Sequence, residues 1–160
     1  MLQLLTGAIA MEARTGNGPS PAGTSEPAIR EFDALILWAM RNWMQAHRER
    51  RCATGPLLET FEFSGLVAAM APLNRMMTLL VLANRRRLAI ATAPSAPISV
   101  DELVLLRILN AARDGQRDLA ATRLGMWMDA PGAAATAHAA QQLSAALYGT
   151  GAQPRCRGRG

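Results

Sequence analysis

The sequence is poor in the residue types that build β-sheets. Aromatic residues make up only 4% of the 160 positions, and the hydrophobic half consists mainly of leucine, alanine, methionine, isoleucine and valine. Strands favour aromatic and β-branched residues, whereas alanine, leucine, methionine and arginine are the strongest helix formers. This composition argues against a sheet protein and predicts an all-α fold. A chain of this length forms one domain by default, because two smaller cores would be marginal.

Cysteine and histidine each occur only twice, and neither pair is clustered. Cys52 and Cys156 lie far apart in the sequence, as do His47 and His138. Disulfide-rich secreted domains, zinc sites and acid-base or nucleophilic active sites all need such residues in convergent patterns. The motifs HExxH, CxxC, GxSxG and the glycine-rich phosphate loop are also absent. We therefore expect no enzyme, no metal and no cofactor, and a reducing, cytoplasmic environment.

Long hydrophobic runs are also missing. Residues 63–84 come nearest to a membrane span, but Pro72, Asn74 and Arg75 lie at the centre of this stretch. An arginine there costs about 2.5 to 3.5 kcal/mol of insertion free energy, so two short helices fit better and a membrane protein is not expected. The opening MLQLLTGAIA lacks the positively charged start of a signal peptide, and Met11 is an alternative first residue.

Lysine is absent, so all 17 basic side chains other than histidine are arginine. We interpret this as the codon bias of a GC-rich bacterial genome rather than as selection for guanidinium chemistry at every site. The net charge is +5, and residues 149–160 contain three arginines and no acid. Because the remainder is nearly balanced, a dedicated polyanion-binding surface on the domain is not the first expectation.

Glycine, proline and small polar residues divide the chain into three segments. They predict that residues 1–26 form a disordered leader and that residues 150–160 form a disordered basic tail. Between them, residues 27–149 are expected to form a single helical domain, a small bundle of about five helices. The two prolines of TAPSAP exclude helix and mark a linker that can act as a hinge at residues 92–98.

Hydrophobic spacing predicts a first helix over about residues 28–50, with one apolar face. Gly55 and Pro56 are expected to end this unit, and further helices are predicted over residues 57–71 and 73–84, separated by a proline. The residues expected on the polar side of the first helix are Arg30, Asp33, Trp38, Arg41, Gln45 and Arg48.

The clearest local signal is a capping box, in which Ser99 and Glu102 predict the start of a helix. This helix should end at residues 114–115, and its wide apolar surface predicts a central place in the bundle. An amphipathic helix over residues 116–128 follows. A last, alanine-rich helix is predicted over residues 131–148, with a proline in its first turn and a glycine after its end.

Binding to another protein is the leading functional hypothesis, reached by elimination. Tryptophan is enriched at interface hot spots and methionine suits adaptable surfaces, although core packing is the alternative for each of these side chains. The candidate partner contacts are Trp38, Met76, Met77 and Trp127. We expect a non-enzymatic adaptor, regulator or assembly partner, with homo-oligomerisation as the simplest form of association.

The alternative hypothesis is a small basic regulator that binds nucleic acid through arginine clusters. One cluster consists of Arg48, Arg50 and Arg51. The candidate polyanion contacts in the other two clusters are Arg85, Arg86, Arg87, Arg155, Arg157 and Arg159. Guanidinium groups neutralise phosphates, whereas the ordinary explanation of the triplet at 85–87 is a helix C-terminus, where cations are stabilised by the helix dipole.

Both cysteines have arginine neighbours. Arg50 and Arg51 precede Cys52, and arginines flank Cys156 on both sides. A neighbouring positive charge favours the thiolate, so two reactive thiols are one interpretation. Chance proximity in an arginine-rich chain is the other.

Overall fold

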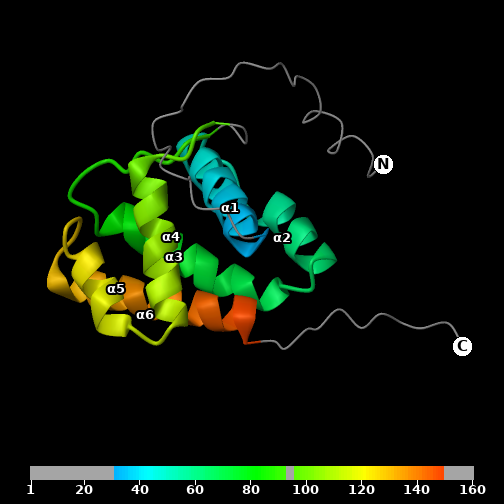
Figure 1. The fold of residues 1–160 in the computed structure, drawn as a ribbon. Coiled ribbons are helices and arrows are strands. Elements are labelled where there is room, and N and C mark those ends of the chain that lie inside the picture. The colour runs from blue at the N-terminus through cyan, green and yellow to red at the C-terminus, as the bar shows by residue number, and fades with distance from the viewer. Residues whose placement is uncertain (1–30, 93–95, 150–160) are drawn as a thin grey trace, which may run out of the picture.

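The computed structural model describes residues 31–92 and 96–149. These residues form six α-helices, one short 3₁₀-helix and no strand. In chain order they are α1 (Glu31–Arg48), α2 (Thr54–Phe63), η1 (Val67–Ala69), α3 (Met70–Leu82), α4 (Val100–Arg113), α5 (Arg117–Leu124) and α6 (Ala130–Tyr148) (Figure 1). The predicted all-α bundle of about five helices is confirmed. The leader predicted at 1–26 and the tail predicted at 150–160 lie outside the described residues.

The alanine-rich helix α6 lies at the centre of the packing, against α3, α4 and α5. Its buried apolar residues are Ala133, Ala137, Ala139, Ala140, Leu143 and Leu147. Because alanine side chains are small, the leucines and methionines of the neighbouring helices fill the space around α6. Helix α4, for which a central place was predicted, also packs against three helices, namely α1, α5 and α6.

Helices α1 and α2 lie to one side of this centre (Figure 1). Helix α1 packs on α2, α3 and α4, and it buries Ile36, Met40 and Trp43. Helix α2 is attached through Leu57 and Phe61, both of which are buried. The apolar stripes of α1 and α2 thus face one common core with α3, as expected for amphipathic surface helices.

Three helices end in the same backbone motif, but one of them uses an unusual residue. After α2 and α4 the left-handed residue is a glycine, Gly65 with φ 69° and Gly115 with φ 75°. After α1 it is Arg50, with φ 54°. The N–H groups of Arg50 and Arg51 donate to carbonyl oxygens in the last turn of α1, at 3.2 and 2.8 Å. This is a Schellman motif, where glycine is usual because an L side chain costs about 1 kcal/mol in that conformation.

Two predicted boundaries near prolines are wrong. Gly55 and Pro56 lie in the first turn of α2 rather than ending the unit before it, and the helix expected over residues 57–71 ends at Phe63. Pro72 lies in the first turn of α3, where a missing N–H sacrifices no intrahelical hydrogen bond. Helix α5 is also shorter than predicted and ends at Leu124.

The capping box and the last helix are confirmed. The Ser99 hydroxyl accepts a hydrogen bond from the Glu102 N–H at 3.1 Å, and the Glu102 carboxylate accepts one from the Ser99 N–H at 2.8 Å. Helix α6 has Pro131 in its first turn and ends at Tyr148, followed by a glycine. These features depend on a few neighbouring residues, which is why the sequence alone identifies them.

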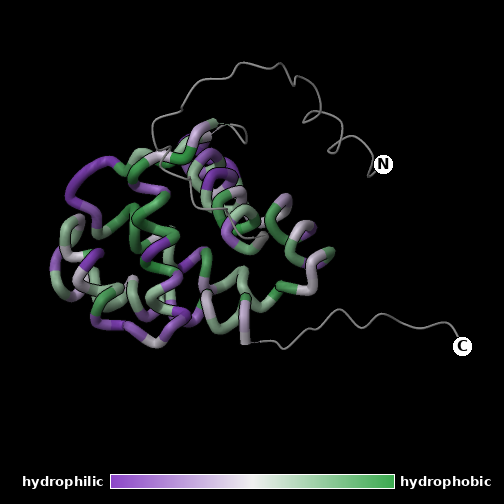
Figure 2. The backbone as a smooth tube through the Cα atoms, in the orientation of Figure 1, coloured by the Kyte–Doolittle hydropathy of each residue, from purple (hydrophilic) through white to green (hydrophobic). Residues whose placement is uncertain are grey.

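None of the helices in the described ranges combines the length and the hydrophobicity that a membrane crossing requires. Hydrophobic residues occur in every helix, whereas the first part of the segment that follows α3 is strongly hydrophilic (Figure 2). This segment contains the arginine triplet.

Candidate functional site

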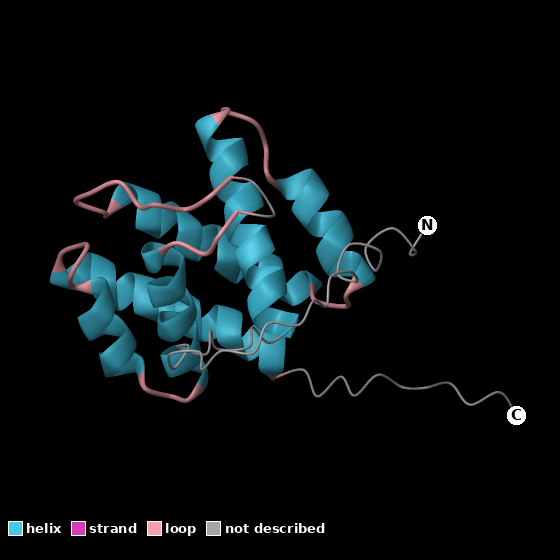
Figure 3. Ribbon diagram, turned by 45° about the horizontal axis from the view of Figure 1, so that its top comes forward, coloured by secondary structure: helices cyan, strands magenta, loops and turns pink. Residues whose placement is uncertain are grey.

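The segment between α3 and α4 runs out to α1 and returns to the start of α4 (Figure 3). Two adjacent carboxylates in the first turn of α4 accept hydrogen bonds from the backbone of this segment. Asp101 Oδ2 accepts a hydrogen bond from the Ala89 N–H at 2.7 Å, and Glu102 Oε1 accepts one from the Ala91 N–H at 3.1 Å. The Ser99 hydroxyl donates to the Ala89 carbonyl. The position of this segment, described over residues 83–92 and 96–99, therefore depends on the N-terminus of α4.

A buried ion pair joins this helix terminus to α1. Arg41 Nε and one terminal nitrogen donate to the two oxygens of Glu102 at 2.8 and 3.0 Å, and the two side chains are only 3% and 0% exposed. Arg41 also donates to the carbonyl oxygens of Ala96 and Pro97, at 3.1 and 3.3 Å. The sequence placed Arg41 on the polar, solvent-facing side of its helix, and that expectation is wrong because Glu102 draws the guanidinium inward.

Hydrogen bonding outweighs burial at Glu102. Burial alone would raise the pKa of this carboxyl group, but the hydrogen bonds from Arg41 and from the Ser99 and Ala91 N–H groups lower the pKa below its usual value. The charged form is therefore the stable one in the folded protein. The same groups that keep Glu102 ionised are the ones that fasten the segment.

Arg86 makes the second ion pair of this region. Its guanidinium donates to both oxygens of Asp101, at 3.0 and 2.5 Å, and lies 5.3 Å from the centroid of the Trp127 ring. The pairing with Arg86 lowers the pKa of Asp101, against a smaller opposing effect of burial. The Arg85 N–H donates to the Trp127 carbonyl at 2.8 Å. Arg86 thus fastens the start of the segment rather than standing as a free cation.

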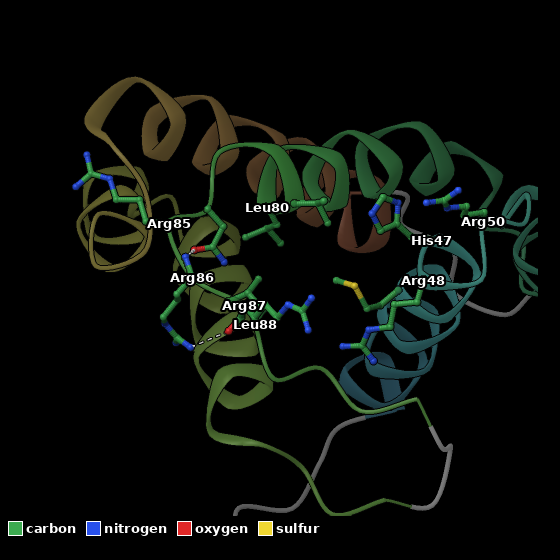
Figure 4. Close-up of a pocket in the computed structure, with 11 residues that line it drawn as sticks. His47, Arg48, Arg50, Leu80, Arg85, Arg86, Arg87 and Leu88 are labelled. Atoms are coloured by element: carbon green, nitrogen blue, oxygen red, sulfur yellow. Dashed lines mark hydrogen bonds between the residues drawn. The ribbon is translucent and has the colours of Figure 1, made fainter.

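A cleft of about 830 Å³ opens between this segment and the C-terminal end of α1. Figure 4 shows the side chains of His47 and Arg48 from α1 and Arg87 from the segment facing the space between them, whereas Arg85 and Arg86 point away from it. The residues that line the cleft are Met44, His47, Arg48, Arg50, Leu80, Val81, Asn84, Arg85, Arg86, Arg87 and Leu88. Two arginine clusters that are separate in the sequence therefore share one cleft.

The lining of the cleft is strongly basic. It contains five arginines and one histidine, and no carboxylate. Arg48 donates to the Ile90 carbonyl at 3.1 Å, which ties it to the segment. Within the described residues, the guanidinium groups of Arg50, Arg85 and Arg87 have no hydrogen-bond or ion-pair partner. Arg86 is neutralised by Asp101, but Arg48, Arg50 and Arg87 have no acidic partner in the part of the chain that the structure describes, and positive charges without counter-charges create a local potential that attracts anions.

The floor of the cleft is apolar, and its edge carries an ordered ring. Met44, Leu80 and Leu88 are buried. The His47 ring stacks on Trp43, with centroids 5.2 Å apart and ring planes at 12°. Trp43 is itself held by a hydrogen bond from its indole N–H to Asn74 Oδ1 at 2.9 Å. The imidazole therefore presents a flat, oriented surface beside the basic groups.

The predicted partner contacts lie elsewhere, mostly in the interior. Met76, Met77 and Trp127 are buried, so a partner could reach them only after a rearrangement. Trp38 is half-buried and packs against the core. The predicted contacts Arg155, Arg157 and Arg159 lie outside the described residues.

The predicted cluster of Arg48, Arg50 and Arg51 is divided as well. Arg51 does not line the basic cleft and pairs with Glu49 at the surface. The sequence missed the roles of Arg41, Asp101 and Glu102. The capping-box pattern was the one available signal, and it indicated a helix start without the two arginines that meet there.

The surroundings of Cys52 differ from the expectation. Cys52 is exposed, and hydrogen bonds with the side chain and backbone of Thr54 lower the pKa of its thiol. The neighbouring arginines, which suggested this effect in the sequence, are not its cause. Cys156 lies outside the described residues, so the suggested thiol pair stays a prediction.

Metal ligands are not gathered anywhere in the two described ranges: no three His, Cys, Asp or Glu side chains come together at a distance that would hold an ion. His138 lies half-buried in α6, away from the cleft that His47 lines, and its Nδ1 atom is buried without a hydrogen-bond partner. In the comparisons with known proteins, no family model, curated protein or solved structure matches this chain.

Proposed function

We propose that this protein is a non-enzymatic binding protein whose ligand is a polyanion, with nucleic acid as the first candidate, held in the arginine-lined cleft. The observation that carries the proposal is that Arg48 and Arg50, at the end of α1, share with Arg87 one cleft whose lining has no carboxylate. Binding to a protein partner was the leading hypothesis from the sequence, but it loses support because three of its four candidate contact residues are buried.

The charge arrangement supports an anionic ligand. Like charges repel one another, and the repulsion persists between charges closer than the Debye length, about 8 Å at physiological ionic strength. The acids nearest to the segment are already engaged, because Asp101 pairs with Arg86 and Glu102 with Arg41. They hold the segment in place without neutralising Arg48 or Arg87. A phosphate between these two guanidinium groups would relieve their repulsion.

The test is the salt dependence of binding to a labelled oligonucleotide of mixed sequence, measured by fluorescence anisotropy on the full chain. For single strands, the slope of log affinity against log salt concentration is about −0.7 per phosphate contacted. We expect the slope of the double variant R48Q/R87Q to be less steep than that of the wild type, by the amount that corresponds to one or two phosphate contacts. R75Q is the matched control, because Arg75 is exposed and does not line the cleft.

The arginines of the predicted tail provide the competing site. In the full chain, the triple variant R155Q/R157Q/R159Q should still bind the oligonucleotide, and adding R48Q/R87Q to it should weaken that binding further. The proposal is wrong if the wild type does not bind at low salt. It is also wrong if R48Q/R87Q binds as R75Q does, or if the tail variant alone abolishes binding.

A protein partner remains the second candidate, on one specific observation. Phe63, at the end of α2, is 88% exposed, and Val67 in η1 is exposed close to it in sequence. Exposed aromatic side chains are enriched at interfaces. Light scattering coupled to size-exclusion chromatography would support self-association if the wild type is a dimer and the F63S variant a monomer. A monomeric wild type would remove homo-oligomerisation.

A further inference from the structure

The cleft is larger and more apolar than a phosphate group requires. Its volume of about 830 Å³ lies in the range of small-molecule sites, about 300 to 1,000 Å³. Besides its arginines, it is lined by Met44, Leu80, Val81 and Leu88. Met44, Leu80 and Leu88 are buried beneath the surface of the cleft, so half-buried Val81 is the apolar side chain that a ligand can reach most readily. The lining therefore favours a ligand that combines an anionic group with a flat apolar one.

The edge of the cleft offers a surface on which a flat ring can stack. The imidazole of His47 is exposed and is held parallel to the Trp43 ring beneath it. In Figure 4 the His47 ring stands at the edge of the same space that Arg48 and Arg87 face. Unpaired nucleobases stack on histidine and on aromatic side chains, and such stacking tolerates any base because each base has a π-face.

Resting on the proposed function, we infer that the cleft binds an unpaired nucleotide unit. The phosphate lies between Arg48 and Arg87, and the base lies against His47 and the apolar floor. In a duplex the faces of the bases are stacked on one another, so only the phosphates would reach the guanidinium groups. The ligand is therefore a single strand or a free nucleotide, which share the chemistry of a phosphate joined to an accessible base.

Arg50 adds an independent reason to regard this edge of the cleft as functional. The equivalent positions after α2 and α4 are glycines, but here the chain keeps an arginine at φ 54°. Residues held in unfavourable backbone conformations concentrate at binding and catalytic sites. The side chain retained at this cost lines the cleft.

The test compares three labelled ligands of equal length on the full protein: an oligothymidine, an abasic strand with the same number of phosphates, and a duplex. We expect the abasic strand and the duplex to bind about 5- to 150-fold more weakly than the oligothymidine, the loss that corresponds to one stacked base. Unlabelled adenosine 5′-monophosphate identifies the source. Displacement of the strand indicates a free nucleotide site, and failure to displace it indicates a strand-binding site.

Variants of His47 separate stacking from charge. H47A should remove the preference for the oligothymidine over the abasic strand, whereas H47F, which restores a flat ring, should keep it. R75Q should change neither the affinity for the oligothymidine nor the affinity for the abasic strand. Circular dichroism verifies that each variant is folded. If R48Q/R87Q weakens all ligands but the abasic strand binds as tightly as the oligothymidine, the inference fails while the polyanion function stands. If no ligand binds, both fail.

Discussion

Replacement of Glu102 by glutamine removes the charge at the point where α1, α4 and the arginine-bearing segment meet. Glu102 is fully buried and accepts hydrogen bonds from the Arg41 side chain and from the N–H groups of Ser99 and Ala91. Glutamine has nearly the same shape but only one acceptor oxygen. The amide N–H groups of glutamine would face Arg41 and the N–H groups of Ser99 or Ala91, which are donors themselves. Because glutamine is neutral, the charge of Arg41 would also stay buried without a counter-charge.

The expected loss is large relative to the stability of a small domain. Removal of one partner of a buried ion pair costs about 3 to 5 kcal/mol, mainly because the other charge stays buried. Small domains unfold at a cost of about 5 to 15 kcal/mol in total. We therefore expect Glu102→Gln to remove about a fifth of the free energy of unfolding or more.

A double variant distinguishes the ion pair from the shape of the site. In Arg41→Met/Glu102→Gln neither charge is buried alone, so the combined loss should be smaller than the sum of the single losses by about 1 to 3 kcal/mol. Some destabilisation should persist, because the carbonyl oxygens of Ala96 and Pro97 lose their donor.

The assay is urea unfolding at neutral pH, followed by far-ultraviolet circular dichroism, with Glu59→Gln as the control. Glu59 is an exposed residue of α2, so its replacement should change the free energy of unfolding by less than about 0.5 kcal/mol. A loss below about 1 kcal/mol for Glu102→Gln, or strictly additive losses in the double variant, would refute the role assigned to the pair.

Three further predictions concern acid, backbone strain and packing. The pKa values of Asp101 and Glu102 are lower in the folded protein than the unfolded-state values of about 4, so both carboxylates stabilise the fold at pH values above about 4. This stabilisation is lost as the pH falls through the lower folded-state pKa values. The urea midpoint should therefore drop steeply in acid, and it should drop less steeply in Glu102→Gln. Arg50→Gly should raise the free energy of unfolding by about 1 kcal/mol while weakening oligonucleotide binding; an unchanged or lower urea midpoint contradicts the strain. Phe61→Ala should cost about 3 to 5 kcal/mol because the ring is fully buried, whereas Phe63→Ala, two residues along, should change the midpoint little; equal losses would contradict the packing of α2.

The helix ends show which parts of the fold can be predicted. The capping box of Ser99 and Glu102 and the glycine at 115 act over a few residues, so the sequence locates both ends of α4. Gly55 and Pro56 were misjudged because a proline fits a chain break and the first turn of a helix equally well. Burial of Leu57 and Phe61 against the core favours the helix, and no local pattern reports that burial.

The candidate site could be predicted only in part. The sequence identified the arginine clusters but not their environments: Arg86 pairs with Asp101, Arg87 faces the cleft and Arg85 points away. Arg41 was assigned to solvent because helical periodicity describes its own helix alone. Its partner lies 61 residues further along the chain.

By itself the sequence determined that the chain is helical, where several helices begin and end, and that its net charge is positive. These properties depend on each residue and its near neighbours, through helix propensity, capping and charge count. Only the tertiary structure decided which arginines meet, which are neutralised and which methionines are buried. Electrostatic energy depends on separation and on exposure to water, and both are set by contacts between segments that are distant in the chain.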